Sequence, residues 1–164
     1  SILEIPSPTG VPFTLQTFAI ALCGFVLGFK QGTLCVFLYV LLGAIGVPIY
    51  AGMTGGLGKL LGVTGGFLFG FIPMTTLCGL KKDSSNKVLP ILLGLIGLIL
   101  CHILGSLQFS LIMTAKNNSE ISFISAALTV SVPYLAKDIL SVIGAYFVSL
   151  ALKHRLKQAN LSIG

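Results

Sequence analysis

Charged residues are scarce in this sequence, and that scarcity limits what the protein can be. Only 4 of its 164 residues are acidic and 10 are Lys or Arg, so that charged residues make up 9% of the chain, whereas soluble domains carry about a quarter. A soluble globular protein is therefore excluded. The hydrophobic content of 55%, with a mean hydropathy of +1.03, also excludes a disordered or collagen-like chain and predicts a protein of the lipid bilayer.

Motifs for catalysis, metal binding and nucleotide binding are also missing. The four cysteines have no CxxC or Cys/His spacing and are predicted to be small buried hydrophobes: Cys23, Cys35, Cys78 and Cys101. A Walker A loop ending at Lys59 would need Gly at position 53 and Ser or Thr at position 60, where the chain has Met53 and Leu60. No Ser/His/Asp set falls on one side of the membrane. We therefore predict that the chain is not an enzyme and binds no metal or cofactor.

The apolar stretches predict membrane spans, because about 20 helical residues are needed to cross about 30 Å of hydrocarbon. Five stretches qualify: Phe13 to Phe29, Thr33 to Tyr50, Leu60 to Leu80, Val88 to Met113, and Ile121 to Leu152. The last is too long for one helix. Pro133 is expected to divide it into a short segment, Ile121 to Val132, and a helix that begins near the proline.

The basic residues predict how these spans are oriented. If the chain enters the first span from outside, seven of the ten basic residues fall on the inner side: Lys30, Lys81, Lys82, Lys87, Lys153, Arg155 and Lys157. The positive-inside bias then places the carboxyl end in the cytoplasm. This clustering also assigns the net charge of +6 to membrane topology and not to a nucleic-acid partner.

The predicted fold class is an all-α, multi-pass membrane protein with one domain over residues 1–164. About five helices are visible in the sequence, and an upstream span ending near Leu3 would complete six. Small residues recur at every fourth position in two series, Gly24, Gly28, Gly32 and Gly62, Gly66, Gly70. This spacing lets helix backbones approach closely, so a compact bundle is expected.

Polar side chains inside the apolar stretches are few, and an ionisable group there costs about 2.5 to 3.5 kcal/mol. Asp138, preceded by Lys137, lies one to two turns into the last helix. It is either a polar anchor for a ligand or half of an ion pair that marks the membrane boundary. Thr14 and Gln16 open the first span, and the Gln16 amide needs hydrogen-bond partners in a dry site.

Two further features stand out. The stretch from Ala51 to Gly66 is rich in glycine, has no charge except Lys59, and can offer backbone groups to a ligand. His102 lies in the middle of the fourth span, and the favoured interpretation is a hydrogen bond to a neighbouring helix, with a proton site as the alternative. The predicted topology places the glycine-rich stretch, Thr14 with Gln16, and Lys137 with Asp138 at outer helix ends. They can form one pocket for a small, mostly apolar ligand with a polar end.

At these same residues the sequence resembles the BioY family, the biotin-specific S component of energy-coupling-factor (ECF) transporters. Four segments carry the resemblance: VPFTLQTFAIAL, LYVLLGAIGVPIYAG, GGLGKLLGVTGGFLFGF and the start of the last helix with Asp138. The match runs in order from Val11 to about Gly70 and resumes at Pro133. As a set, these motifs are specific.

The resemblance implies a bundle of six transmembrane helices that captures biotin at the outer face of the cytoplasmic membrane. The partners it implies are two ATPase subunits, which use the ATP, and one transmembrane coupling subunit. Carried over by position, the implied binding residues are Thr14, Gln16, Tyr39, Thr64, Gly65, Gly66, Lys137 and Asp138. Asp138 belongs to the polar pair that reads the ureido ring. The family's lysine one turn later is Ser141 here, so that either Lys137 takes its place or the ring is held differently.

Two other functions stay open from the residues alone. In a small channel or proton-coupled carrier, His102 would line a path across the bilayer. A membrane enzyme or assembly factor is the least favoured, because paired acid and base residues are lacking.

Overall fold

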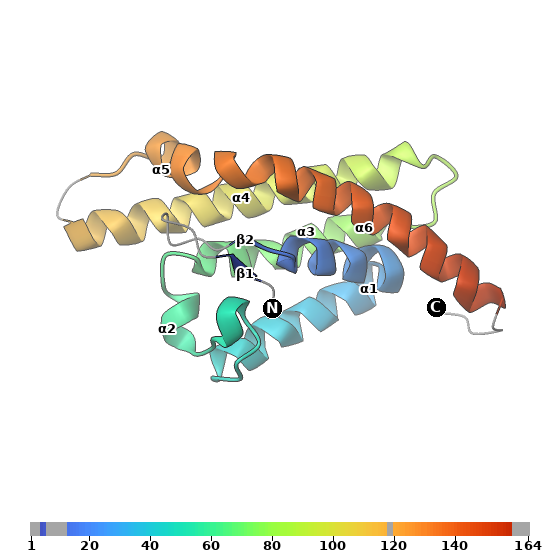
Figure 1. The fold of residues 1–164 in the computed structure, drawn as a ribbon, viewed down its shortest axis with the longest axis horizontal. Coiled ribbons are helices and arrows are strands. Elements are labelled where there is room, and N and C mark those ends of the chain that lie inside the picture. The colour runs from blue at the N-terminus through green and yellow to red at the C-terminus, as the bar shows by residue number, and fades with distance from the viewer. Residues whose placement is uncertain (1–3, 6–12, 118–119, 159–164) are drawn as a thin grey trace.

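The computed structural model describes residues 4–5, 13–117 and 120–158, and these residues are almost all helical (Figure 1). The elements in chain order are β1 (Glu4–Ile5), β2 (Phe13–Thr14), α1 (Gln16–Ala44), the 3-10 helix η1 (Ala51–Met53), α2 (Leu57–Leu60), α3 (Gly65–Leu80), α4 (Val88–Asn117), α5 (Phe123–Val130) and α6 (Val132–Gln158). The two short strands pair in antiparallel fashion. The predicted all-α membrane fold is confirmed. By length and composition α4, α6 and the whole of α1 can cross a membrane, although α1 is divided by a turn, and α3 is a shorter apolar helix.

Helix α1 folds back on itself at Gly28. Gly28 has φ 83° and ψ −179°, a conformation that only glycine adopts easily. Gly24 and Gly32 lie so close that a Cβ on Gly32 would be 3.2 Å from the Cα of Gly24, whereas eight residues of straight helix extend about 12 Å. Two arms, 16–27 and 29–44, therefore lie side by side (Figure 1). They correspond to the first two predicted spans, although the second arm ends at Ala44 and not at Tyr50.

The glycine series are sites of close helix packing, as predicted for most of their members. A Cβ on Gly24 would lie 2.6 Å from the Thr75 carbonyl oxygen, and one on Gly70 would lie 2.6 Å from the Cα of Cys101. Helix α3 thus contacts α1 on one side and α4 on the other without intervening side chains. Gly28 is the exception in its series, because it makes the turn.

The end of the chain follows the prediction made from Pro133. The segment predicted as Ile121 to Val132 forms α5, whose first turn is capped by Ser122, and α6 begins at Val132, beside the proline. The prediction of four buried cysteines is only partly right. Cys78 and Cys101 are buried, whereas Cys23 is half-buried and Cys35 is exposed. An apolar run does not say which of its faces points out of the bundle.

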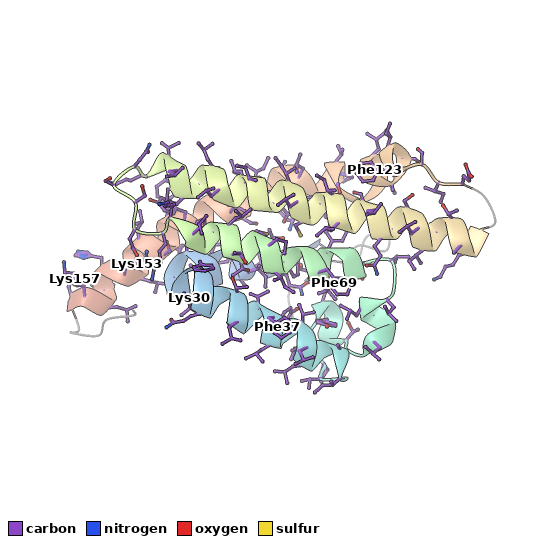
Figure 2. The ribbon with its side chains drawn as sticks, turned by 180° about the vertical axis from the view of Figure 1, so that it is seen from behind. Lys30, Phe37, Phe69, Phe123, Lys153 and Lys157 are labelled. Carbon is purple, nitrogen blue, oxygen red and sulfur yellow. The ribbon has the colours of Figure 1, made fainter. Side chains whose placement is uncertain are left out.

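Basic segments gather at one end of the bundle. Lys30, Lys153 and Lys157 lie at the same end in Figure 2, opposite Phe123. The connection between α3 and α4 joins them, because the Lys153 ammonium donates to the Asp83 carboxylate at 2.8 Å. The segments predicted to share one side of the membrane therefore meet in space.

Candidate functional site

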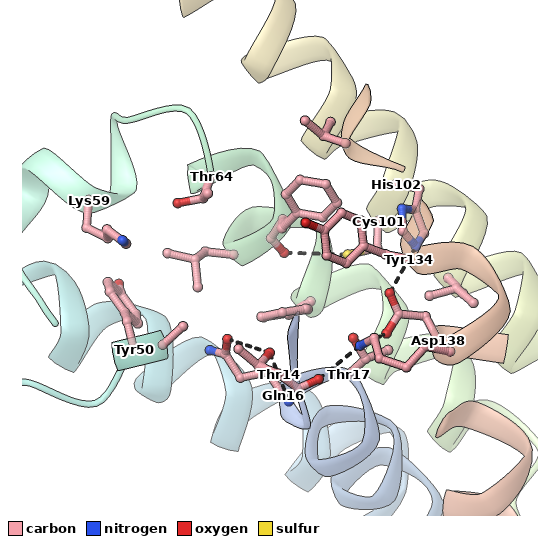
Figure 3. Close-up of a pocket in the computed structure, with 17 residues that line it drawn as sticks. Thr14, Gln16, Thr17, Tyr50, Lys59, Thr64, Cys101, His102, Tyr134 and Asp138 are labelled. Atoms are coloured by element: carbon pink, nitrogen blue, oxygen red, sulfur yellow. Dashed lines mark hydrogen bonds and ion pairs between the residues drawn. The ribbon is translucent and has the colours of Figure 1, made fainter. Parts of the chain in front are cut away.

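A cavity opens between the beginning of α1, the glycine-rich connection, α3, α4 and the beginning of α6 (Figure 3). Its lining residues come from segments that are up to 124 positions apart, from Thr14 to Asp138. The polar ones are Thr14, Gln16, Thr17, Tyr50, Lys59, Thr64, His102, Tyr134, Lys137 and Asp138, and the apolar ones are Ala51, Phe67, Leu68, Phe71, Leu98, Cys101 and Val130. The predicted convergence of three remote stretches is what the structure shows.

The carboxylate of Asp138 lies between two nitrogen groups. Its Oδ1 is 2.5 Å from the Lys137 ammonium, and its Oδ2 is 3.4 Å from Nε2 of His102. Asp138 is only 5% exposed, which is not the position of an ion pair that marks a membrane boundary. A buried carboxylate needs such partners, because desolvation of an unpaired charge costs several kcal/mol, on the order of the pairing energy itself.

His102 is hydrogen-bonded to a neighbouring helix, as the sequence favoured, and its partner is Asp138 of α6. Its ring also packs edge-on against Phe67, with ring centroids 5.7 Å apart. Nδ1 of His102 is buried and has no hydrogen-bond partner within the described part of the chain. His102 and Asp138 are 36 positions apart in the sequence and lie on different helices, so the spacing of residues within one helix could not reveal this pair.

Hydrogen bonds fix the start of α1 against the end of its second arm. The Thr14 hydroxyl donates to Oε1 of Gln16, and Nε2 of Gln16 donates to the Tyr39 hydroxyl at 2.5 Å. Tyr39 in turn donates to the Ile49 carbonyl. Both ends of the Gln16 amide thus have the partners that a dry site requires. Tyr39 lies behind Gln16 and does not line the cavity.

The glycine-rich connection places Thr64 and Lys59 on the cavity, but Gly65 and Gly66 face away from it. A Cβ on Gly66 would lie 2.2 Å from the Leu104 carbonyl oxygen, so this residue packs against α4. Nε2 of Gln108, on α4, donates to the carbonyl oxygens of Leu60 and Gly62 at 2.9 and 2.8 Å. Gln108 therefore ties the connection to the bundle.

Apolar and aromatic side chains line the rest of the cavity. Phe67 and Phe71 project from α3, and Leu98 comes from α4. Tyr50 is buried and donates to the Val40 carbonyl at 2.6 Å. Burial raises the pKa of its phenol, which keeps the hydroxyl protonated and able to donate. Such a cavity suits a small ligand with a polar ring and an apolar body.

Five of the eight predicted site residues line the cavity: Thr14, Gln16, Thr64, Lys137 and Asp138. Sequence reasoning did not identify the aromatic lining residues Phe67, Phe71 and Tyr134. Tyr134 had a signal, because it precedes Asp138 by one helical turn and thus shares its face. Lys59 and His102 were noted, but in other roles.

The comparisons with known proteins point the same way. The model of the BioY family matches residues 1–158. The chain is 40% identical over 154 residues to a biotin transporter BioY from Thermotoga maritima, covering 91% of this chain and 85% of the relative. It is 39% identical over 147 residues to a biotin transporter BioY from Rhodobacter capsulatus, with 85% and 77% covered. Its fold is similar to the crystal structure of an S-component for biotin from an ECF-type ABC transporter, with a TM-score of 0.78 and 26% identity, covering 92% of this chain and 80% of the other.

Proposed function

This chain belongs to the BioY family, whose members are transporters and not enzymes, and we propose that it captures biotin in the cavity beside Asp138 as the substrate-binding component of an ECF-type transporter. The observation that carries the proposal is the buried Asp138 carboxylate in the wall of an otherwise largely apolar cavity. A buried polar group of this kind is retained where a ligand uses it.

The chemistry of biotin matches the cavity. Its ureido ring has two N–H donors and one carbonyl acceptor, and its fused thioether ring is apolar. Asp138 accepts hydrogen bonds from the ureido N–H groups, and the Lys137 ammonium, which also donates to the Thr14 carbonyl at 2.9 Å, lies where it can donate to the ureido oxygen. The apolar ring packs between Phe67 and Phe71.

The packing below the cavity favours capture over a channel. A channel or a proton-coupled carrier needs a polar path from His102 toward the basic end of the bundle. The buried side chains of that region include Phe25, Met74 and Cys78, each 0% exposed, and the equally buried Thr75 hydroxyl among them donates to the Ile20 carbonyl. The polar contacts of the His102 side chain instead continue through Asp138 and Lys137 to Thr14 at the beginning of α1.

Titration of the detergent-purified protein with biotin tests the site. We expect Asp138→Asn together with Gln16→Ala to weaken binding more than tenfold, because each loss of a partner from a buried polar group costs about 1 to 3 kcal/mol. Asp83→Asn is the matched control, since that carboxylate is 67% exposed and lies at the basic end. A smaller loss contradicts the site, and an unaltered chain that binds no biotin contradicts the function.

We also propose that this chain works with two ATPase subunits and a transmembrane coupling subunit. The similarity to an S-component supports this assembly, and the chain's own residues offer no Walker A loop. Cells that express the chain with this module should lose biotin uptake when ATP is depleted. Uptake that survives ATP depletion but stops with a protonophore would instead support a proton-coupled carrier.

A further inference from the structure

The cavity has two cationic side chains, and they differ in what neutralises them. Lys137 is 2.5 Å from the Asp138 carboxylate and also donates to the Thr14 carbonyl oxygen at 2.9 Å. Its charge is balanced before any ligand arrives. A ligand carboxylate placed here would also approach Asp138, whose like charge repels it.

Lys59 is the other cation, and its surroundings are different. Its side chain is half-buried, and it makes no ion pair or hydrogen bond with the residues that the structure describes. Figure 3 shows its ammonium turned into the cavity, beside Thr64 and on the side away from Asp138. This end of the cavity therefore has a positive charge with a hydroxyl next to it and no carboxylate.

The segment that carries Lys59 is held in place. Lys59 lies in α2, between the exposed Gly58 and the buried Leu60. Gln108 donates hydrogen bonds to the carbonyl oxygens of Leu60 and Gly62. These two residues lie between Lys59 and Thr64 in the sequence. The ammonium is thus directed at the cavity by a fixed backbone, although the side chain itself has rotational freedom.

We propose that Lys59 binds the carboxylate at the end of the aliphatic tail of biotin, with Thr64 as a second donor and the ureido ring at Asp138. This inference rests on the proposed function and adds the residue that binds the tail carboxylate and thereby determines specificity. Biotin has one polar neutral end and one anionic end, and the cavity has one balanced ion pair and one unbalanced cation. Only this orientation brings opposite charges together.

A comparison of two ligands and several variants tests the proposal. The ligands are biotin and biotinamide, which differ only in that the tail carboxylate is an uncharged amide. Lys59→Met removes the ammonium and keeps the length of the side chain, and Lys59→Arg keeps a cation. Lys137→Met removes the other cation of the cavity, and Lys116→Met removes a cation that does not line it. Affinities are measured by calorimetry of the purified chain at low and high salt.

We expect Lys59→Met to weaken biotin about five- to tenfold and biotinamide less than twofold, since a partly exposed ion pair contributes about 1 kcal/mol. Lys59→Arg should stay near the unaltered affinity, and added salt should weaken biotin only when residue 59 is cationic. Lys116→Met should change neither ligand.

Three outcomes would overturn the proposal. Equal losses for both ligands in Lys59→Met would make Lys59 a structural residue of the connection. No loss for either ligand would place the carboxylate elsewhere. If Lys137→Met weakened biotin but not biotinamide, and Lys59→Met weakened neither, the tail carboxylate would lie at Lys137 and the ligand would be bound in the opposite orientation. An unaltered chain that binds neither ligand would instead overturn the proposed function, so that the two failures are distinguishable.

Discussion

At the scale of single residues, the most informative feature is the set formed by Lys137, Asp138 and His102. A membrane helix with a carboxylate is costly, and here two nitrogen groups share the compensation. Lys137 could be suspected from its position next to Asp138 in the sequence. His102 could not, because the approach of α4 to α6 brings it within 3.4 Å. We therefore expect the histidine to position the Asp138 carboxylate.

Two substitutions of His102 should distinguish the effect of its hydrogen bond on biotin affinity from the effect of its size. An amide nitrogen in His102→Gln can reach the position of Nε2, whereas the shorter chain of His102→Asn cannot. We expect His102→Asn to weaken biotin binding roughly tenfold, because hydrogen bonds to charged groups contribute about 1.5 to 3 kcal/mol, and His102→Gln to recover most of it. The readout is the same titration, with His154→Gln as the control at the exposed basic end. Equal effects of Gln and Asn would contradict a hydrogen-bonding role.

Two glycines give a matched test of packing. A Cβ on Gly66 would lie 2.2 Å from the Leu104 carbonyl oxygen, whereas one on Gly58 would have nothing within 4 Å. We expect Gly66→Ala to destabilise the fold by about 1 to 3 kcal/mol and Gly58→Ala to leave it unchanged. Thermal unfolding in detergent measures both. Similar melting temperatures for the two variants would show that α3 and α4 can separate without cost.

At the scale of elements, the sequence predicted the lengths of the helices better than the positions of the turns between them. The spans from Val88 and around Pro133 were located within a few residues, because their length, apolar composition and proline position are local properties. A reversal of the chain was predicted between Phe29 and Thr33, whereas the structure turns slightly earlier, at Gly28. Gly24, Gly28 and Gly32 have the same spacing in the sequence, so that only tertiary contacts decide which of them makes the turn. The two arms were predicted as separate spans, but not their contact through Gln16 and Tyr39.

The glycine-rich connection depends on one side chain of another element. Gln108→Leu removes both hydrogen bonds to Leu60 and Gly62 and keeps a similar volume. We expect biotin affinity to fall about three- to tenfold, since each net hydrogen bond contributes about 0.5 to 1.5 kcal/mol, and the melting temperature to fall little. Limited proteolysis of the connection reports its opening. Unchanged affinity with faster cleavage would show that the connection does not take part in binding.

At the scale of the whole molecule, the basic residues are distributed unevenly along the bundle. The basic segments meet at one end of the bundle, whereas the cavity lies toward the other end, between the beginnings of α1 and α6. This separation agrees with a cavity that opens outside and basic ends in the cytoplasm, which is the predicted orientation. The site could be placed from the sequence because charge and span order are global properties; its aromatic wall, including Phe67 and Phe71, depends on which faces of α3 turn inward.

Reporter fusions test the orientation directly. Green fluorescent protein fused after Gln158 should fluoresce, and alkaline phosphatase fused there should be inactive, because the carboxyl end is expected in the cytoplasm. Phosphatase fused after Lys116, at the far end of α4, should be active. The opposite pattern would mean that the cavity faces the cytoplasm.

The two hydrogen bonds from Gln108 to the glycine-rich connection have a consequence for the kinetics of binding. The glycine-rich connection would cover bound biotin while both hydrogen bonds from Gln108 are intact. The dissociation rate of biotin would then depend on breaking these two bonds and not on the separation of the long helices. Substitution of Gln108 alone would therefore change both the dissociation rate and the rate of uptake, although Gln108 does not line the cavity.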